Sequence, residues 1–345
     1  MPDNLYVHFP FCRTKCSYCA LYSRAGVSQS DRDAYVRRLA QEIKRTGDER
    51  RETLKTIYFG GGSPALCDLS VLIPVLRPLL GEETEFTVEL HPLDVTEVKF
   101  RELKDLGVNR ISMGVQSLDD ATLADMGRGY TVDEAERAFA RVKEHFDNAG
   151  IDLIVGYPGD DVKVVGVGVG ERWNFKRLES WGLKHCSVYS LQNERGLKGV
   201  PDDDWTLDRL REVGNCLRTM GLERYEISNY AVPGYECRHN FAVWRGEDYL
   251  GLGDGACGRI GLKRTKFGTV ETVTPEFDMK ERALFRLRTR EGLDLRSLSS
   301  LPNFPDVSNI LAKHVGLGLL TQKGMVYRLT DRGMEVCDSI LAELV

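Results

Sequence analysis

Short apolar runs alternate with longer amphipathic stretches through the first two-thirds of the chain. The runs predict strands at Leu5–Phe9, Thr56–Phe59, Glu85–Leu90, Arg110–Val115, Ile151–Val155 and Cys186–Leu191. The stretches predict helices near Asp31–Thr46, Leu69–Leu80, Val95–Leu106, Val132–His145, Glu171–Trp181 and Leu207–Met220. Successive βα units indicate a parallel sheet with helices outside it, and therefore an α/β fold of the partial (β/α)6 TIM-barrel type.

The alternation ends near Tyr225. Residues Tyr225–Ile260 are rich in glycine, aromatic and charged side chains and predict a long structured segment. A small winged-helix-like domain is then predicted from helices near Glu281–Thr289 and Val307–Val315, a strand pair at Leu320–Thr321 and Val326–Leu329, and a last helix near Asp331–Leu344. We expect a barrel over residues 1–230, a connecting segment over 231–275 and a C-terminal domain over 276–345.

Composition and charge narrow the possible functions. The 345 residues include 47 Lys and Arg against 52 Asp and Glu, a net charge of −5 that argues against nucleic-acid binding. For the winged-helix-like domain we accordingly favour a packing or lid role. No apolar run approaches the roughly 18 residues of a membrane span, and Met1–Tyr6 does not resemble a signal peptide. We therefore expect a cytoplasmic protein.

Three of the nine cysteines, Cys12, Cys16 and Cys19, follow the first predicted strand, and the other six are scattered. Three thiolates at this spacing can hold an iron–sulfur cube and leave one iron open to a small molecule. Zinc is an alternative that needs a fourth ligand such as His8, although this is not a usual zinc spacing. Buried structural thiols are a third reading.

The C-x₃-C-x₂-C motif after a first strand resembles the signature of the radical S-adenosylmethionine (SAM) superfamily. Other segments resemble its oxygen-independent coproporphyrinogen oxidase-like subfamily: Tyr6–Cys12, Phe59–Pro64, Gly114–Ser117, Asp152–Gly159, Tyr225–Ala231, Cys237–Asn240 and Tyr249–Gly253. The similarity runs from Leu5 to the last predicted helix. It implies a [4Fe–4S] cluster on Cys12, Cys16 and Cys19, whose open iron binds the amino and carboxylate groups of SAM.

The resemblance also implies which residues bind the cofactors. The positions that match are Tyr6, Gly61, Gly62, Ser63, Glu89, Gln116, Arg128 and Asp152, most of them at strand ends. We expect Gly60–Gly62 to allow close approach of the methionyl amine, and Arg128 to pair with the methionyl carboxylate. Asp152 lies among apolar residues and needs a partner, which a ribose hydroxyl or Arg128 can provide. The structural alternatives are a tight βα turn for the glycines, salt bridges at the barrel rim for the charged residues, and a core position for Tyr6.

Two branches of the subfamily share this framework, the oxidase and the HemW-like heme chaperones. The oxidase carries a fourth cysteine where Leu21 stands and a long extension before the cluster, whereas eleven residues precede Cys12 here. The chaperones carry His-Asn-x-x-Tyr-Trp, and this chain has His239–Trp244 with Val243 at the Tyr position. His239 is either a heme ligand or a hydrogen-bonded loop residue. The branch implied is the heme chaperone, with the oxidase as the alternative.

The chaperone resemblance implies heme, heme-accepting enzymes and an electron donor as partners. It leaves open a homodimer, peripheral membrane contact, and a delivery protein in which the radical chemistry is vestigial. Two segments depart from the subfamily, Glu89–Pro92 and Val162–Gly170, and we expect a locally altered cofactor or substrate rim. Within the second, Val164–Gly170 lacks the spacing of a phosphate loop and is interpreted as a surface loop.

Overall fold

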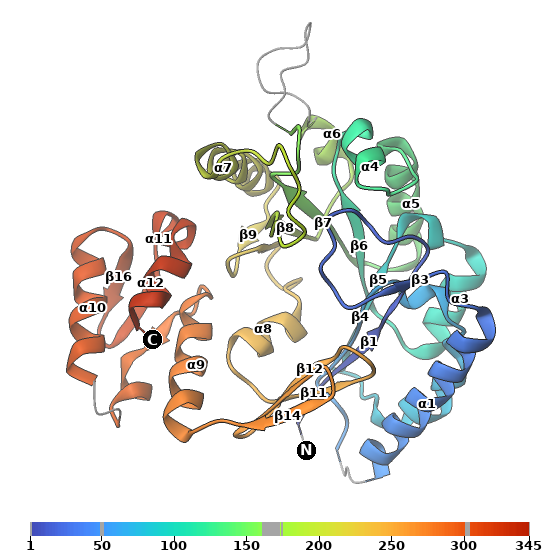
Figure 1. Ribbon diagram of the computed structural model, residues 1–345, viewed down its shortest axis with the longest axis horizontal. Coiled ribbons are helices and arrows are strands. Elements are labelled where there is room, and N and C mark those ends of the chain that lie inside the picture. The colour runs from blue at the N-terminus through green and yellow to red at the C-terminus, as the bar shows by residue number, and fades with distance from the viewer. Residues whose placement is uncertain (1, 49–51, 161–172, 174, 301–303, 345) are drawn as a thin grey trace, which may run out of the picture.

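A parallel sheet with helices on its outside forms the centre of the fold (Figure 1). The computed structural model describes residues 2–48, 52–160, 173, 175–300 and 304–344. Its central strands lie side by side in chain order: β1 (Asn4–Phe9), β4 (Thr56–Gly61), β5 (Glu85–Leu90), β6 (Arg110–Gln116), β7 (Asn148–Val155) and β8 (His185–Ser190). Every predicted strand is present, and the α/β partial-barrel fold is confirmed.

The helices of the outer layer bury one apolar face each. They are α1 (Gln29–Asp48), α2 (Ile73–Leu76), α3 (Glu97–Leu106), α4 (Asp120–Asp125), α5 (Val132–His145), α6 (Phe175–Ser180) and α7 (Asp203–Thr219). In α5, Thr131 and Glu134 form a reciprocal capping box at the N-terminus. Ala135, Phe139 and Val142 recur at helical spacing and are buried. Local capping and the core-facing pattern therefore specify the same helix.

The helix predicted over Leu69–Leu80 is wrong in form. The chain makes three short helical pieces instead, at Ser70–Leu72, Ile73–Leu76 and Arg77–Leu79. Pro74 and Pro78 lie in this stretch, and each lacks the N–H that a continuous helix needs. Leu72, Leu76 and Leu79 are still buried. The apolar pattern therefore predicted which residues are buried, but not that the helix is broken.

The sheet is wider than the sequence predicted. On one side, β11 (Tyr249–Leu252) pairs parallel to β1 and is followed by antiparallel β12 (Cys257–Ile260), β13 (Lys263–Lys266) and β14 (Thr269–Thr272). On the other, β10 (Asn229–Ala231) and β9 (Glu223–Arg224) add to β8. The connecting segment thus widens the sheet beyond β1, and the end of the predicted barrel region widens it beyond β8. The Val164–Gly170 stretch lies outside the described residues.

The C-terminal elements form a separate layer beside the barrel (Figure 1). They are α9 (Pro275–Leu287), β15 (Leu293–Asp294), α10 (Phe304–Gly316), β16 (Leu320–Lys323), β17 (Val326–Leu329), α11 (Asp331–Glu335) and α12 (Cys337–Leu344). The three strands form a small antiparallel sheet, and Leu287, Leu311 and Ile340 belong to a hydrophobic core of this layer. The predicted last helix is interrupted at Val336.

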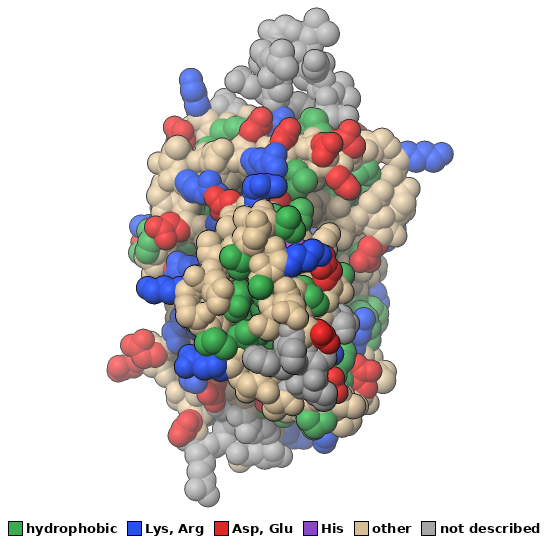
Figure 2. All heavy atoms as spheres, turned by 90° about the vertical axis from the view of Figure 1, so that its left-hand side faces the viewer, with side chains coloured by type: hydrophobic (Ala, Val, Ile, Leu, Met, Phe, Trp, Pro, Cys, Tyr) green, Lys and Arg blue, Asp and Glu red, His purple; other side chains and the backbone are tan. Residues whose placement is uncertain are grey.

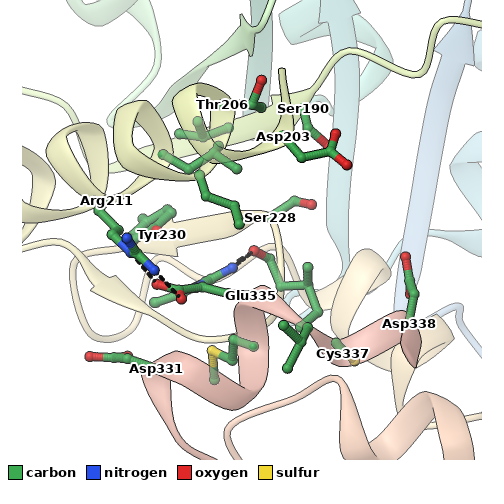
Figure 3. Close-up of a pocket in the computed structure, with 18 of the residues that line it drawn as sticks. Ser190, Asp203, Thr206, Arg211, Ser228, Tyr230, Asp331, Glu335, Cys337 and Asp338 are labelled. Carbon is green, nitrogen blue, oxygen red and sulfur yellow. Dashed lines mark hydrogen bonds and ion pairs between the residues drawn. The ribbon is translucent and has the colours of Figure 1, made fainter. Parts of the chain in front are cut away.

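A cavity of about 600 Å³ lies between α7 and the C-terminal helices (Figure 3). Across it, Arg211 of α7 makes two hydrogen bonds of 2.7 Å to the carboxylate of Glu335 on α11. None of the residues predicted to bind a cofactor lines this cavity. It separates the two layers and is not the candidate site.

The surface of the C-terminal layer carries both signs of charge. Figure 2 faces this side of the molecule and shows Lys and Arg side chains interspersed with Asp and Glu, around apolar side chains near the centre. A nucleic-acid surface would concentrate positive charge, and the face in this view does not. Among the described residues, no helix is long and apolar enough to cross a membrane.

Candidate functional site

Most of the predicted site residues surround one cavity of about 440 Å³ at the carboxyl ends of the parallel strands. Those that line it are Cys12, Cys16, Cys19, Gly61, Gly62, Ser63, Glu89, Gln116, Arg128 and Asp152. We call it the cysteine cavity. Parallel strands bring their carboxyl ends to one edge of a sheet, which explains why residues so far apart in sequence meet there.

The three candidate ligand cysteines lie on the segment after β1. Cys12 ends β2 (Phe11–Cys12), which pairs with β3 (Arg24–Ala25), and Cys16 and Cys19 lie between these short strands. All three are free thiols with partial exposure. Nη1 of Arg128 lies 3.4 Å from Sγ of Cys16 and places a cation beside it. Burial raises the pKa of the Cys12 thiol, so metal binding must displace its proton.

The arrangement does not favour zinc. His8, the candidate fourth ligand, uses both ring nitrogens, since Nε2 donates to the Tyr22 carbonyl at 2.8 Å and Nδ1 accepts from the Tyr6 hydroxyl at 2.9 Å. Within the described residues, no three His, Cys, Asp or Glu side chains are placed to hold a metal ion between them. A cube offers each thiolate a different iron. Three thiols around an open cavity therefore fit an iron–sulfur cluster better than one zinc ion.

The glycines at the end of β4 are required by the protein's own contacts. A Cβ on Gly61 would lie 2.4 Å from Cε1 of His8, and a Cβ on Gly62 would lie 2.3 Å from the carbonyl oxygen of Phe11. Gly61 also has φ of +108°, a region that favours glycine. Close packing thus explains the glycines without a cofactor. Gly61 and Gly62 nevertheless line the cysteine cavity, where the methionyl amine is expected.

Glu89 is held by two donors at the end of β5. The Tyr58 hydroxyl donates to Oε1 at 2.8 Å, and the Gly61 backbone N–H donates to Oε2 at 2.9 Å. Burial and then the charge of Asp152 raise the pKa of Glu89 to about 7. This carboxyl group therefore changes protonation near neutral pH and can either accept or donate a hydrogen bond inside the cavity.

Asp152 and Arg128 do not pair as the sequence suggested. The Ser112 hydroxyl donates to Asp152 at 3.1 Å from the neighbouring strand, and burial raises the pKa of this carboxyl group. Arg128 instead donates from Nε to the Tyr130 hydroxyl at 2.9 Å and from Nη2 to the Gly114 carbonyl at 2.6 Å. The pairing of β6 with β7 brings the Ser112 hydroxyl to Asp152. The sequence around Asp152 does not predict which residue of β6 lies beside it.

Two further residues of the cysteine cavity show how its wall is shaped. Gln116 has φ of +75° and ends β6 just after an irregularity in its pairing with β7. Such a backbone conformation is uncommon for residues other than glycine. It changes the direction of the Gln116 side chain relative to the rest of β6. Ser63 donates its hydroxyl to Asp94, which also accepts from Nε of Arg13 at 2.9 Å. The Ser63 hydroxyl is therefore already engaged within the protein.

Tyr6 and His239 lie in a second cavity of about 460 Å³, which we call the aromatic cavity. Aromatic rings dominate its lining, with Tyr6, Tyr22, Tyr58, Tyr249 and Phe267 contributed by separate parts of the chain. Four residues line both cavities: Leu21, Tyr58, Glu89 and Tyr189. The two cavities are therefore neighbours with a common wall. Tyr6 belongs to the aromatic side of that wall and does not line the cysteine cavity.

His239 is fixed at the start of α8 (Arg238–Trp244). The carboxylate of Glu85 accepts from the backbone N–H groups of Arg238 and His239, both at 3.0 Å, and so caps this helix. The His239 ring lies 5.2 Å from the Tyr58 ring, between centroids. Burial and then the charge of Arg110 lower the pKa of His239 to about 3. The imidazole is therefore neutral at physiological pH, as a metal ligand must be.

Hydrogen bonding determines which nitrogen of His239 carries the proton. Nδ2 of Asn4 donates to the Asp248 carbonyl at 3.1 Å, so its Oδ1 faces Thr56 and accepts the Thr56 hydroxyl proton at 2.9 Å. The Thr56 oxygen can then only accept from Nδ1–H of His239, at 2.7 Å. Nε2 has no hydrogen-bond partner among the described residues and keeps its lone pair for the aromatic cavity.

Val243 and Trp244 have different positions within the incomplete motif. Val243 lines the aromatic cavity four residues after His239, on the same face of α8. Trp244 also lines this cavity, and its ring packs edge-on against Phe285 of α9, with centroids 5.4 Å apart, so it joins α8 to the C-terminal layer. The sequence identified His239 but missed Thr56, Asn4 and most of the aromatic lining, because no local spacing connects them.

Comparisons with known proteins agree with this geometry. The profile of the Radical SAM superfamily matches residues 6–165. The chain is 34% identical to the heme chaperone HemW of Lactococcus lactis over 78% of this chain and 73% of that protein. It is 30% identical to HemW of Bacillus subtilis over 99% of this chain and 100% of that protein.

Among solved structures, coproporphyrinogen III oxidase HemN from Escherichia coli superposes with a TM-score of 0.82. That match covers 99% of this chain and 89% of HemN at 20% sequence identity. At such an identity the likeness establishes the fold alone, so it does not choose between the two branches.

Proposed function

The chain belongs to the HemW family of the radical SAM superfamily, and we propose that it binds heme in the aromatic cavity and delivers it to heme-dependent enzymes. The observation that carries this proposal is His239. Its imidazole is neutral, its Nδ1 proton is held by Thr56, and its Nε2 is open to a cavity lined by aromatic rings. Those are the requirements of an axial heme ligand.

The cysteine cavity serves the family's other cofactors, a [4Fe–4S] cluster and SAM. We propose that Cys12, Cys16 and Cys19 hold the cluster, which when reduced supplies the electron that cleaves bound SAM. Arg128 places a fixed cation beside Cys16. Gly61, Gly62, Ser63, Glu89, Gln116 and Asp152 bind and orient SAM in this proposal, because all of them line the same cavity.

The two carboxyl groups have distinct roles in this proposal. Glu89 lies in the common wall and, with its raised pKa, can present a proton or a lone pair to either occupant. Asp152 lies on the cysteine side only, held by Ser112. Tyr6 supports the aromatic side by donating its hydroxyl to His8.

The remaining parts of the proposal concern partners and organisation. An electron donor must reduce the cluster, and heme-dependent enzymes must receive the heme. We also propose a cytoplasmic location, and a division into a barrel over residues 1–230, a connecting segment over 231–275 and a C-terminal domain over 276–345. The separate hydrophobic core of the C-terminal layer supports that last boundary. A homodimer is compatible with the proposal but is not needed for it.

One pair of assays distinguishes delivery from oxidation. The cluster is reconstituted without oxygen, and the protein is given SAM, a reductant and coproporphyrinogen III. We expect no catalytic formation of protoporphyrinogen IX. Protein loaded with heme is then mixed with an apo heme enzyme, and we expect transfer from wild type but not from His239→Ala. His145→Ala, on the outer helix α5, is the matched control and transfers like wild type.

Two results would contradict the proposal. Protoporphyrinogen IX formed over many turnovers would identify the oxidase. Heme binding and transfer by His239→Ala at the wild-type level would remove His239 as the ligand. Measuring 5′-deoxyadenosine in the same reactions shows whether SAM is cleaved during turnover or is only bound.

A further inference from the structure

The hairpin between β13 and β14 has an unusual residue at its tip. Its two-residue turn consists of Phe267 and Gly268, with φ of +50° and +79°. Hairpin turns of this kind require positive φ at both positions and therefore favour Asn-Gly or Asp-Gly. A bulky aromatic residue with positive φ is strained. Within the described part of the chain, only Gln116 shares this property among non-glycine residues.

Packing inside the protein does not account for the aromatic ring at this position. Phe267 is 57% exposed, although it is a large apolar side chain. Its nearest ring partner is Tyr22, whose centroid is 6.2 Å away and which is itself 43% exposed. Both residues line the aromatic cavity. A strained backbone that holds an exposed ring beside a cavity indicates a role in binding what enters the cavity.

Strand pairing holds the hairpin tip beside the aromatic cavity. Antiparallel pairing places Lys266, directly before the turn, opposite Cys257, which also lines the aromatic cavity. The Phe267 backbone N–H donates to the Ala256 carbonyl at 3.3 Å and fixes the tip beside the start of β12. The tip therefore stands at the edge of the sheet that carries the site.

We propose that Phe267 is a ligand-binding residue whose ring packs on the flat apolar surface of heme in the aromatic cavity. The inference rests on the proposed function, because it takes heme as the occupant. A planar macrocycle is the ligand shape that exposed aromatic rings at a cavity mouth contact best. Asn would relieve the strain but would present no ring, which explains why a residue disfavoured by the turn stands there.

The test uses a substitution that affects the turn and the ligand in opposite directions. Asn favours positive φ, so Phe267→Asn keeps the hairpin, and its thermal midpoint is expected to equal or exceed that of wild type. Heme affinity, measured by Soret titration, is expected to fall about tenfold with loss of the ring contact. Phe267→Tyr retains a ring and is expected to bind heme like wild type.

The matched control lies on the same hairpin. Val270 is 59% exposed on β14 but does not line the aromatic cavity, so Val270→Asn is expected to leave heme affinity unchanged. Metal-free protoporphyrin IX adds a second readout, followed by quenching of protein fluorescence. A ring contact predicts that Phe267→Asn weakens this ligand too, whereas His239→Ala does not, because there is no iron to bind.

The outcomes separate this inference from the proposed function. If wild type binds heme and His239→Ala loses it, but Phe267→Asn binds like wild type, only the role of Phe267 is overturned. The same conclusion follows if Val270→Asn loses as much affinity as Phe267→Asn. If wild type does not bind heme at all, the proposed function fails and this inference fails with it.

Discussion

The two neighbouring cavities are built on different chemistry. The cysteine cavity is lined by thiols and by charged groups such as Arg128 and Asp152. The aromatic cavity is lined by many aromatic rings, and burial lowers the pKa of its His239 to about 3, which keeps that imidazole neutral. The first suits a charged cluster and the ionic groups of SAM, whereas the second suits a large flat apolar molecule. The comparison indicates two binding functions, which substitutions should separate.

The largest effect is expected from Cys16→Ala. Two thiolates cannot hold a stable cube, so the broad iron–sulfur absorption of the reconstituted protein should disappear. Heme binding should persist, because no cluster cysteine lines the aromatic cavity. Cys216→Ala, which removes a partly exposed thiol on α7, should retain the full absorption. Persistent absorption in Cys16→Ala would show that the ligand assignment is wrong.

His239→Ala should give the reverse result. Loss of the axial ligand is expected to weaken heme binding at least tenfold and to shift the Soret band. The iron–sulfur absorption should be unchanged, because His239 does not line the cysteine cavity. Heme titration of the reconstituted protein measures both properties in one sample. A parallel loss of the cluster would mean that the two cavities are not independent binding sites.

Glu89→Gln tests the common wall through the pH dependence of stability. The folded pKa of Glu89 is about 7, against an ordinary value of 4.5. The folded state therefore binds more protons than the unfolded state between these values, and stability falls as pH rises from about 4.5 to 7. Above pH 7 the cost is about 3 kcal/mol, and Gln should remove it.

Urea unfolding of wild type and Glu89→Gln at pH 5 and pH 8 measures this difference. The advantage of the variant should be larger at pH 8. Equal pH dependence in the two proteins would show that the pKa of Glu89 is not raised. Asp119→Asn, which alters a carboxylate that caps α4, is the control and should keep the wild-type pH dependence.

The smallest effect is expected from Thr56→Val, which removes the acceptor for Nδ1–H of His239. The ring can then rotate or change tautomer, so heme should bind a few-fold more weakly, with a changed ligand-field spectrum. Thr56→Ser restores the hydroxyl and should restore the spectrum. If Thr56→Val and wild type have the same spectrum, the hydroxyl does not select the nitrogen that faces the cavity.

The cavities also differ in how far the sequence could predict them. Nine of the ten residues of the cysteine cavity named above lie on the barrel strands, directly after them or in the segment that carries the cysteine motif, so a parallel sheet brings them together once its strands are identified. Arg128, between α4 and α5, is the exception. The aromatic cavity combines β1, the cysteine loop, α8, β11 and the β13–β14 hairpin. These elements are brought together by pairing between strands that are far apart in the sequence, and the spacing of apolar residues does not predict that pairing.

Particular contacts show the same limit. The sequence offered Arg128 as a partner for Asp152, but the register of β6, β7 and β8 supplies Ser112 instead. It offered His8 as a zinc ligand, but Tyr6 and Tyr22 occupy both of its nitrogens. Which side chains meet across two strands depends on the register of their pairing. A shift of one residue would turn every side chain of a strand to the other face of the sheet.

The wall shared by the two cavities is a route by which their occupants can be thermodynamically linked. Because Leu21, Tyr58, Glu89 and Tyr189 each face both sides, an occupant that shifts any of them changes the free energy of binding on the other side. Such coupling is reciprocal, so the factor by which SAM changes heme affinity must equal the factor by which heme changes SAM affinity. A chaperone built this way can use the state of one small molecule to set when it releases the other.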